Sequence, residues 1–232
     1  MTYDLEKRLP YPVLALVVLA LFYAVYFGKM LAQRRQGIVT DQIGRRREKT
    51  LHRVELLMKT ATCAIVPAQL LSIALNWSAL PDNARLTGFG VGLVGDGVFL
   101  AAVLCMRDSW RAGIPDRDKT ALVTGGIYAF SRNPAFLGFD LMYAGVLLMY
   151  LNPLTAALTA FAVVMLHLQI LQEERYLVHA FGAPYQAYCR PMFLLYSVYD
   201  GAGGKDSVAP MLSAHIDRFI AKIESDYRAC QN

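Results

Sequence analysis

Five apolar segments dominate the hydrophobic pattern of this chain, and each approaches the length of a membrane-spanning helix. The segments cover residues 11–28, 60–80, 86–106, 134–151 and 153–171. A helix needs roughly 20 residues to cross the hydrocarbon core of a bilayer, and the last two segments lie near the lower limit. None alternates polar and apolar residues as a barrel strand must. The sequence therefore predicts an all-α integral membrane bundle of about five transmembrane helices, ending in a helical hairpin that turns at Asn152-Pro153.

The composition agrees with a membrane protein. Hydrophobic residues make up 56% of the chain and charged residues only 18%, whereas about a quarter of a soluble domain is charged. The first segment could instead be a secretory signal. However, its apolar core is long, no small-x-small cleavage site follows it, and the flank beyond it is basic. We therefore expect it to be retained as the first helix.

Lys and Arg residues are distributed unevenly among the predicted connections. Connections 29–53 and 107–133 are rich in both, whereas 81–85 holds only Arg85 and the Asn152-Pro153 turn holds none. Because cytoplasmic loops carry the excess of positive charge, we predict that the N-terminus lies outside and that the C-terminus and the active site lie on the cytoplasmic side. The membrane is expected to be a bacterial inner membrane. The net charge of +5 is then explained by basic connections that meet anionic headgroups, so nucleic-acid binding is not expected.

The chain divides into three predicted regions. Residues 1–106 form the first three transmembrane helices, 107–200 form a catalytic region with the last two, and 201–232 form a flexible linker followed by an amphipathic helix. The four cysteines show no Cys-x-x-Cys pair and no histidine at metal-ligand spacing. No disulfide framework and no metal site are therefore predicted.

Two polar motifs flank the predicted hairpin. The first runs from Leu122 to Pro134 and the second from Glu173 to Tyr188. Because the hairpin crosses the bilayer and returns, both motifs must lie on the same side of it. This arrangement can assemble one site at a membrane surface, and it indicates an enzyme rather than a passive anchor.

The first motif offers groups that suit an anionic, aromatic ligand. Pro134 is suited to the first turn of a helix, whose unpaired N–H groups can receive a carboxylate. Arg132 would add a bidentate partner for that carboxylate. The Gly125-Gly126 pair allows close approach of the backbone to a ligand, and Tyr128 provides a ring for stacking.

The second motif offers carboxylates. Glu173 and Glu174 can bind an amine or the hydroxyls of a ribose. A ligand with a carboxylate, an amine and an aromatic ring would satisfy both motifs, and S-adenosylmethionine has all three. The alternative is that Arg132 extends toward the membrane surface and the two glutamates are solvated.

Together the motifs resemble the isoprenylcysteine carboxyl methyltransferase family, which is related to membrane phospholipid methyltransferases. The resemblance covers about residues 107–192 and includes the Leu-Val-Thr segment at 122–124, Tyr128, the Arg-Asn-Pro segment at 132–134, and the paired glutamates with Phe181-Gly182. It implies S-adenosylmethionine as the cofactor and methyl transfer to oxygen, nitrogen or sulfur of a lipophilic or amphipathic acceptor. Membrane lipids are the expected partners.

The resemblance, with the ligand argument above, also assigns roles to individual residues. The predicted cofactor-binding residues are Thr120, Ala121, Leu122, Val123, Tyr128, Asn133, Pro134, Ala135, Phe136, Glu173 and Glu174. The predicted catalytic residues are Gln169 and Arg132.

Three positions depart from the family pattern. Asn133 replaces the usual His, and Phe136 replaces a frequent Tyr, but Asn still donates and accepts hydrogen bonds. Gln169 occupies a position where eukaryotic members carry an Arg associated with the substrate carboxylate. Because Gln cannot pair ionically with a carboxylate, we expect a neutral, amine or thiol acceptor group.

Some alternatives stay open at this stage. A membrane scaffold or small transporter that retains the fold is the second hypothesis, although no paired repeats of a transporter are visible. His167 and His179 could act as a base for an amine acceptor or be structural. Asp96 and Asp140 fall within predicted spans, where an ionisable side chain serves either a site or a helix contact.

Overall fold

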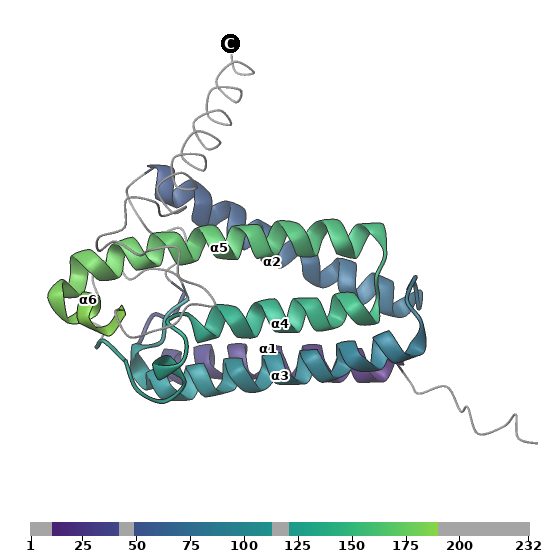
Figure 1. Ribbon diagram of the computed structural model, residues 1–232, viewed down its shortest axis with the longest axis horizontal. Helices are drawn as coiled ribbons and strands as arrows, with labels where there is room; N and C mark the ends of the chain where they lie inside the picture. Colours follow the sequence, from purple (N-terminus) through teal and green to yellow (C-terminus); the bar gives the residue numbers. More distant parts are fainter. Residues whose placement is uncertain (1–10, 42–48, 113–120, 190–232) are drawn as a thin grey trace, which may run out of the picture. The chain divides into compact units, whose positions relative to one another are not determined.

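Six α-helices and two short 3₁₀ helices make up the computed structural model, which describes residues 11–41, 49–112 and 121–189 (Figure 1). For residues 49–54 only the backbone is described. All described residues belong to one unit, residues 1–193. The helices are α1 (Tyr11–Arg35), α2 (Lys49–Ala74), α3 (Asp82–Met106), α4 (Pro134–Met149), α5 (Pro153–Phe181) and α6 (Ala183–Cys189), with η1 (Arg107–Ser109) and η2 (Gly126–Ala129) between α3 and α4.

The all-α prediction is confirmed, and the described helices fit a membrane protein. Four of them, α1, α2, α3 and α5, contain segments long and apolar enough to cross a bilayer. The fifth apolar helix, α4, has only 16 residues. The predicted amphipathic helix within 201–232 lies outside the described residues.

Two helix ends differ from the sequence prediction. α2 ends at Ala74 rather than near residue 80, because the chain turns at Asn76, where φ is +47°. α5 extends beyond the predicted residue 171 to Phe181, since Gln172, Glu173 and Glu174 are good helix formers. It stops at Gly182, whose φ of +57° a residue with a side chain would adopt only with strain. The start of the second polar motif is therefore an extension of the hairpin helix and not a separate loop.

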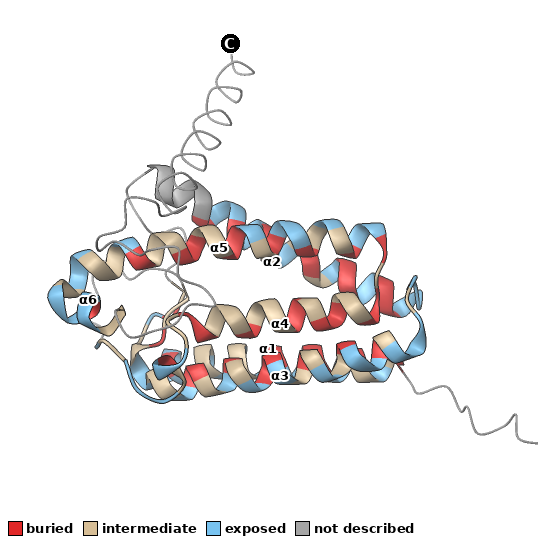
Figure 2. Ribbon diagram, in the orientation of Figure 1, coloured by how far each residue is buried: buried red, intermediate tan, exposed pale blue. Residues whose placement is uncertain are grey.

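The helices form two groups. α3 and α4 share the most extensive helix contact, because glycines on both helices bring the backbones close together. α1 packs on this pair through Val18 against Gly92 and through Phe22 stacked on Phe99. α2 packs mainly on α5. Figure 2 shows buried positions running along the helices of both groups.

A polar clamp joins the two groups at the end of the bundle where the hairpin turns. Asn152 caps α5 through a capping box with Thr155, and its amide nitrogen donates to the Ser72 hydroxyl at 3.0 Å. The Arg85 guanidinium lies 4.3 Å and 4.8 Å from the ring centres of Tyr11 and Tyr150. These contacts tie α1, α2 and α3 to the α4–α5 turn, so that end of the bundle is fixed.

Candidate functional site

A cavity of about 500 Å³ lies between the two helix groups, near the end opposite the clamp. Its walls are mostly apolar and aromatic, and they include Tyr23 and Tyr26 of α1, Phe99 of α3, and Phe139 and Tyr143 of α4. Polar side chains from the connections and from α5 line the rest of it. A mostly apolar cavity of this volume with a few convergent polar groups is typical of a small-molecule site.

A buried ion pair holds the start of α4 against α5. The Arg132 Nε lies 3.2 Å from Glu174 Oε1, and the two side chains are only 5% and 3% exposed. Asn133 donates from its side-chain amide to the same oxygen at 3.1 Å. Glu174 therefore joins the first motif to the second. Its side chain does not line the cavity.

Glu173 and Gln169 lie on the cavity side of α5, one helical turn apart. Gln169 donates from Nε2 to Glu173 Oε1 at 3.3 Å, and both residues line the cavity. The side-chain amide oxygen of Gln169, Oε1, is buried and accepts no hydrogen bond from any described residue. Arg132, also a lining residue, has a buried Nη2 that donates none within the described part of the chain. Gln169 and Arg132 thus each line the cavity and carry a buried polar atom without a hydrogen-bond partner among the described residues, an acceptor and a donor respectively.

Tyr128 closes the cavity from the η2 side. Its backbone carbonyl accepts a hydrogen bond from the Tyr188 hydroxyl at 2.6 Å, which fastens η2 to α6. Burial, reinforced by the nearby charge of Glu173, raises the pKa of Tyr128 above its ordinary value. Its phenol is therefore neutral at physiological pH and presents an uncharged ring.

The hairpin brings most of the predicted site residues to this one cavity. The predicted residues that line it are Tyr128, Arg132, Asn133, Ala135, Phe136, Gln169 and Glu173. Ala121, Leu122, Val123, Pro134 and Glu174 are described but are not among the lining residues, and Thr120 lies outside the described residues. The Ala121 backbone N–H donates to Ser109 Oγ at 3.3 Å, so this segment still lies beside a lining residue.

The glycine pair of the first motif has a packing role at one of its positions. Gly126 has a φ of +63°, and a Cβ there would lie 2.6 Å from the Cys105 sulfur of α3. Gly126 is therefore needed for contact with α3. At Gly125, which is exposed and does not line the cavity, a Cβ would meet no atom within 4 Å, so packing does not require a glycine there.

Comparison with known proteins gives one match. Residues 89–184 match the phospholipid methyltransferase family. This confirms the resemblance to the related isoprenylcysteine carboxyl methyltransferases and supports a membrane methyltransferase. No curated protein and no solved structure matches the chain.

The segment matched to the phospholipid methyltransferases contains both polar motifs and the hairpin, but it leaves out α1 and α2. The structure shows that these two helices also line the cavity, with Tyr23, Tyr26 and Met30 from α1 and Met58 and Cys63 from α2 among the lining residues. The sequence identified them only as apolar spans. No signal in a single sequence marks which apolar side chains face a cavity.

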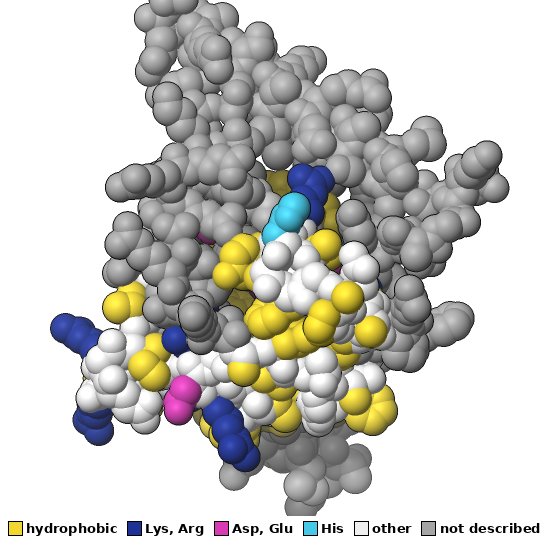
Figure 3. Space-filling view, turned by 90° about the vertical axis from the view of Figure 1, so that its left-hand side faces the viewer, with side chains coloured by type: hydrophobic (Ala, Val, Ile, Leu, Met, Phe, Trp, Pro, Cys, Tyr) yellow, Lys and Arg dark blue, Asp and Glu magenta, His cyan; other side chains and the backbone are white. Residues whose placement is uncertain are grey.

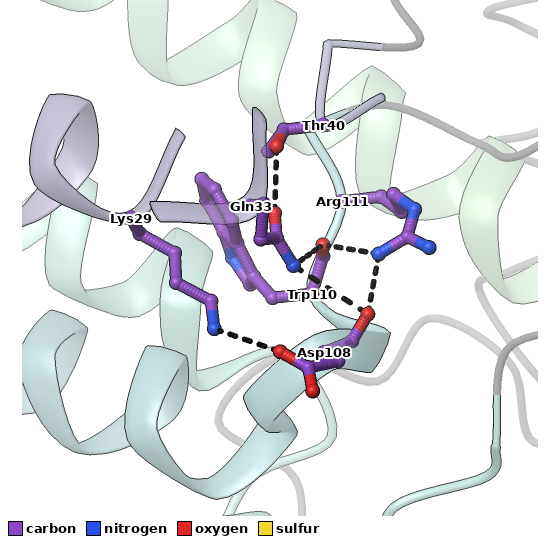
Figure 4. A network of polar contacts seen from close by, with 6 residues as sticks. All are labelled: Lys29, Gln33, Thr40, Asp108, Trp110 and Arg111. Carbon is purple, nitrogen blue, oxygen red and sulfur yellow. Dashed lines mark hydrogen bonds and ion pairs between the residues drawn. The ribbon is translucent and has the colours of Figure 1, made fainter. Parts of the chain in front are cut away.

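Two residues at or behind the cavity wall were not predicted from the sequence. Trp110 is only 4% exposed and lines the cavity. Gln33, near the end of α1, is fully buried and bonds to the backbone of the segment that carries Trp110 (Figure 4). A polar residue near the end of an apolar span was the only signal for Gln33.

Other ionisable residues of the apolar helices lie elsewhere. His167, His179, Asp96 and Asp140 are described, and none of them is among the lining residues. Both Asp96 carboxylate oxygens are buried and make no hydrogen bond within the described part of the chain. A catalytic role for either histidine therefore has no geometric support.

Proposed function

We propose that this chain is an integral-membrane methyltransferase that uses S-adenosylmethionine and acts on a lipophilic or amphipathic acceptor. The cavity carries the proposal: an apolar, aromatic chamber between helices that also receives polar side chains from both motifs of a methyltransferase segment. The basic C-terminal end of α1 and the site lie at the same end of the bundle, which fits a site facing the cytoplasm.

The residues present suit this cofactor. Arg132 Nη2 is a buried donor without an acceptor among the described residues, as a carboxylate would require. Glu173 lines the cavity and can accept hydrogen bonds from ribose hydroxyls or from an amine. Tyr128 and Phe136 add ring surface for an adenine. The arrangement holds the cofactor residues on one side of the cavity, at the start of α4 and on α5.

The chain's own residues contribute alignment and exclusion of water. S-adenosylmethionine, when bound, supplies an electrophilic methyl group for in-line displacement, and no covalent enzyme intermediate is needed. Holding two reactants in line can supply much of the acceleration. The aromatic walls exclude water. The side-chain oxygen Oε1 of Gln169, which has no donor among the described residues, accepts a hydrogen bond from an amine, hydroxyl or thiol of the acceptor.

Replacement of Glu173 by Ala is expected to weaken cofactor binding. Purified protein in detergent should bind S-adenosylhomocysteine, and Glu173→Ala should raise the Kd by roughly 10- to 100-fold, because a charged hydrogen-bond partner is lost. Isothermal titration calorimetry measures both constants. His179→Ala is the matched control, since His179 is an exposed residue of α5 that does not line the cavity. Absence of binding by the intact protein at millimolar ligand would contradict the proposed function.

Gln169 is expected to set the acceptor class. A side-by-side assay would offer a prenylcysteine analogue, phosphatidylethanolamine and a small thiol, and follow transfer of a labelled methyl group. The wild type should prefer an acceptor whose reacting group is not a carboxylate. Gln169→Arg should raise activity on the prenylcysteine carboxylate, since it restores an ion pair worth roughly 1.5–3 kcal/mol.

Gln169→Met is the control for that substitution, because it removes the hydrogen bond to Glu173 without adding charge. Robust turnover of the prenylcysteine analogue by the wild type would show that Gln169 does not exclude carboxylates. No methyl transfer to any acceptor or to a lipid extract, with cofactor binding also absent, would favour the scaffold hypothesis.

A further inference from the structure

The cavity is polar toward one end and apolar toward the other. Its charged and amide side chains lie toward the end opposite the clamp, and they include Lys59, Arg111, Arg132, Asn133, Gln169 and Glu173. Figure 3 views the bundle from that end, where Lys and Arg side chains are visible. The lining residues nearest the clamp are apolar or aromatic. A ligand should therefore place its polar group away from the clamp and its apolar part toward it.

The apolar end of the cavity is closed at the same level on four helices. The innermost lining residues are Tyr23 of α1, Val66 of α2, Tyr143 of α4 and Leu166 of α5. We call these four residues the floor of the cavity. One turn farther toward the clamp, the residues on the same helix faces are at most 5% exposed and do not line the cavity: Leu19, Gln69, Val146 and Ala162. The space between the two helix groups therefore ends at the floor.

The two tyrosines of the floor are held in place by aromatic packing. Tyr143 is fully buried, and its ring centre lies 6.0 Å from that of Phe139. The Tyr23 ring meets Phe22 edge-on, with ring centres 5.6 Å apart, and Phe22 is stacked on Phe99 at 4.5 Å. The phenols of Tyr23 and Tyr143 lie next to each other. Because both rings contact the aromatic core, a ligand cannot displace them without disturbing α1, α3 and α4.

Helix geometry gives the depth of the apolar end. On α5, Leu166 lies one helical turn closer to the clamp than Gln169, a distance of about 5 Å along the axis. On α4, the rise from Asn133 to Tyr143 is about 15 Å. The apolar end is therefore at most about half as deep as a hydrocarbon core of ~30 Å. A long chain that entered it would have to fold back or leave the cavity sideways.

We propose that the apolar end of the cavity holds the apolar part of the acceptor, and that the floor, chiefly Tyr23 and Tyr143, limits the length of that part. The proposal rests on the proposed function for the word acceptor. The acceptor that fits is an amphiphile whose reacting polar group lies at Gln169 and Glu173 and whose inward-pointing apolar part is short or compact. A chain that leaves the cavity sideways would not be affected by the floor, and the test separates the two cases.

Trp110 provides a binding signal that does not depend on catalysis, because it lines the same cavity. The chain has two tryptophans, so Trp77→Phe leaves Trp110 as the only one. In that background we would titrate n-alkylamines of increasing chain length in one detergent and follow Trp110 fluorescence. Their amine suits the oxygens of Gln169 and Glu173. Partition of each amine into the micelles is the same for every variant, so it cancels when variants are compared at one chain length.

Two substitutions change the depth of the cavity in opposite directions. Tyr143→Leu removes a ring from the floor and should lower the Kd of the longer amines, by up to about fourfold for each methylene that newly fits. Val66→Phe adds a ring to the floor and should raise the Kd of the longer amines roughly tenfold. In both variants the Kd of the shortest amines should stay within about twofold of the wild type, since these ligands do not reach the floor.

Each substitution has a matched control. Tyr143→Phe keeps the ring, so it should leave the dependence on chain length unchanged. Val164→Phe adds the same ring as Val66→Phe, but at an exposed position of α5 that does not line the cavity. A damaged fold would weaken binding at every chain length, and if Tyr143→Leu behaved in that way, Val66→Phe would still decide the question.

The same dependence on chain length in the wild type and in Val66→Phe would overturn the proposal, because the chain would then leave the cavity without meeting the floor. Absence of saturable binding of any amine would also overturn it. S-adenosylhomocysteine binding is measured in parallel on the same samples. Failure to bind that compound would contradict the proposed function, whereas the amine titration reports on the floor whether or not the cofactor binds.

Discussion

Replacement of Arg132 by Ala is expected to lower the free energy of unfolding by about 3–5 kcal/mol, because it leaves a buried carboxylate without its ionic partner. Glu174 is only 3% exposed, and among the described residues its Oε1 accepts from Arg132 and Asn133 alone. In Arg132→Ala, the Asn133 side-chain amide would be the one described donor that remains to Glu174 Oε1. Desolvation of the unpaired charge accounts for most of the expected cost.

A double-substitution cycle measures this interaction. Arg132→Met combined with Glu174→Met should recover most of the stability lost in Arg132→Ala, since an apolar pair of similar volume carries no charge to desolvate. Unfolding in detergent, followed by far-ultraviolet circular dichroism against increasing dodecyl sulfate, reports the differences. A cost below about 1 kcal/mol for Arg132→Ala would place the pair among weak surface ion pairs and contradict its burial.

Replacement of Gly145 by Ala is expected to destabilise the bundle by about 1–3 kcal/mol through overpacking. A Cβ on Gly145 would clash with the Gly92 nitrogen and would lie 2.7 Å from the Gly88 carbonyl oxygen, both backbone atoms of α3. Backbone atoms cannot move aside as a flexible side chain does, so α3 and α4 would have to separate. We therefore expect the destabilisation by Gly145→Ala to lie at the upper end of this range.

Gly97→Ala is the matched control for this substitution. Gly97 lies on α3, but a Cβ there would meet no atom within 4 Å. Ala is a better helix former than Gly by roughly 0.5–1 kcal/mol, so the control should be neutral or slightly more stable. The same unfolding titration compares the two variants. Equal behaviour of Gly145→Ala and Gly97→Ala would mean that α3 and α4 are not in close contact.

The hairpin argument predicted the meeting of the two motifs, and the structure bears out that part of the site geometry. Arg132, Asn133, Gln169 and Glu173 lie at one cavity because the connection between α4 and α5 is short and both helices return to the same end. The cofactor roles of these residues stay predictions. The sequence could not show that Glu173 lines the cavity while Glu174 pairs with Arg132, since the side of α5 that faces the cavity depends on how the helix packs.

The contribution of α1 and its connection was not predictable in the same way. Gln33 acts on residues 75 and 77 positions away in sequence, and its partners are backbone carbonyls, which leave no side-chain pattern. In the sequence, Trp110 stands just beyond an apolar span, as tryptophans at a membrane interface do. It is buried because residues 107–112 return onto α1. Such contacts depend on the path of irregular segments, for which hydrophobic periodicity carries no information.

The shortness of α4 determines how deep in the bilayer the reaction would occur. Its 16 residues span about 24 Å at ~1.5 Å per residue, roughly 6 Å less than a ~30 Å hydrocarbon core. The turn after α4 is bound to the connection between α2 and α3, where the Ala79 backbone N–H donates to the Leu151 carbonyl. If that end of the bundle lies at one bilayer surface, the shortfall would fall at the other end of α4, where Arg132 and Asn133 lie. In that placement the hydrophobic mismatch would put the start of α4 below the headgroups. A lipid could then present its polar group to the site by sinking slightly, without leaving the leaflet.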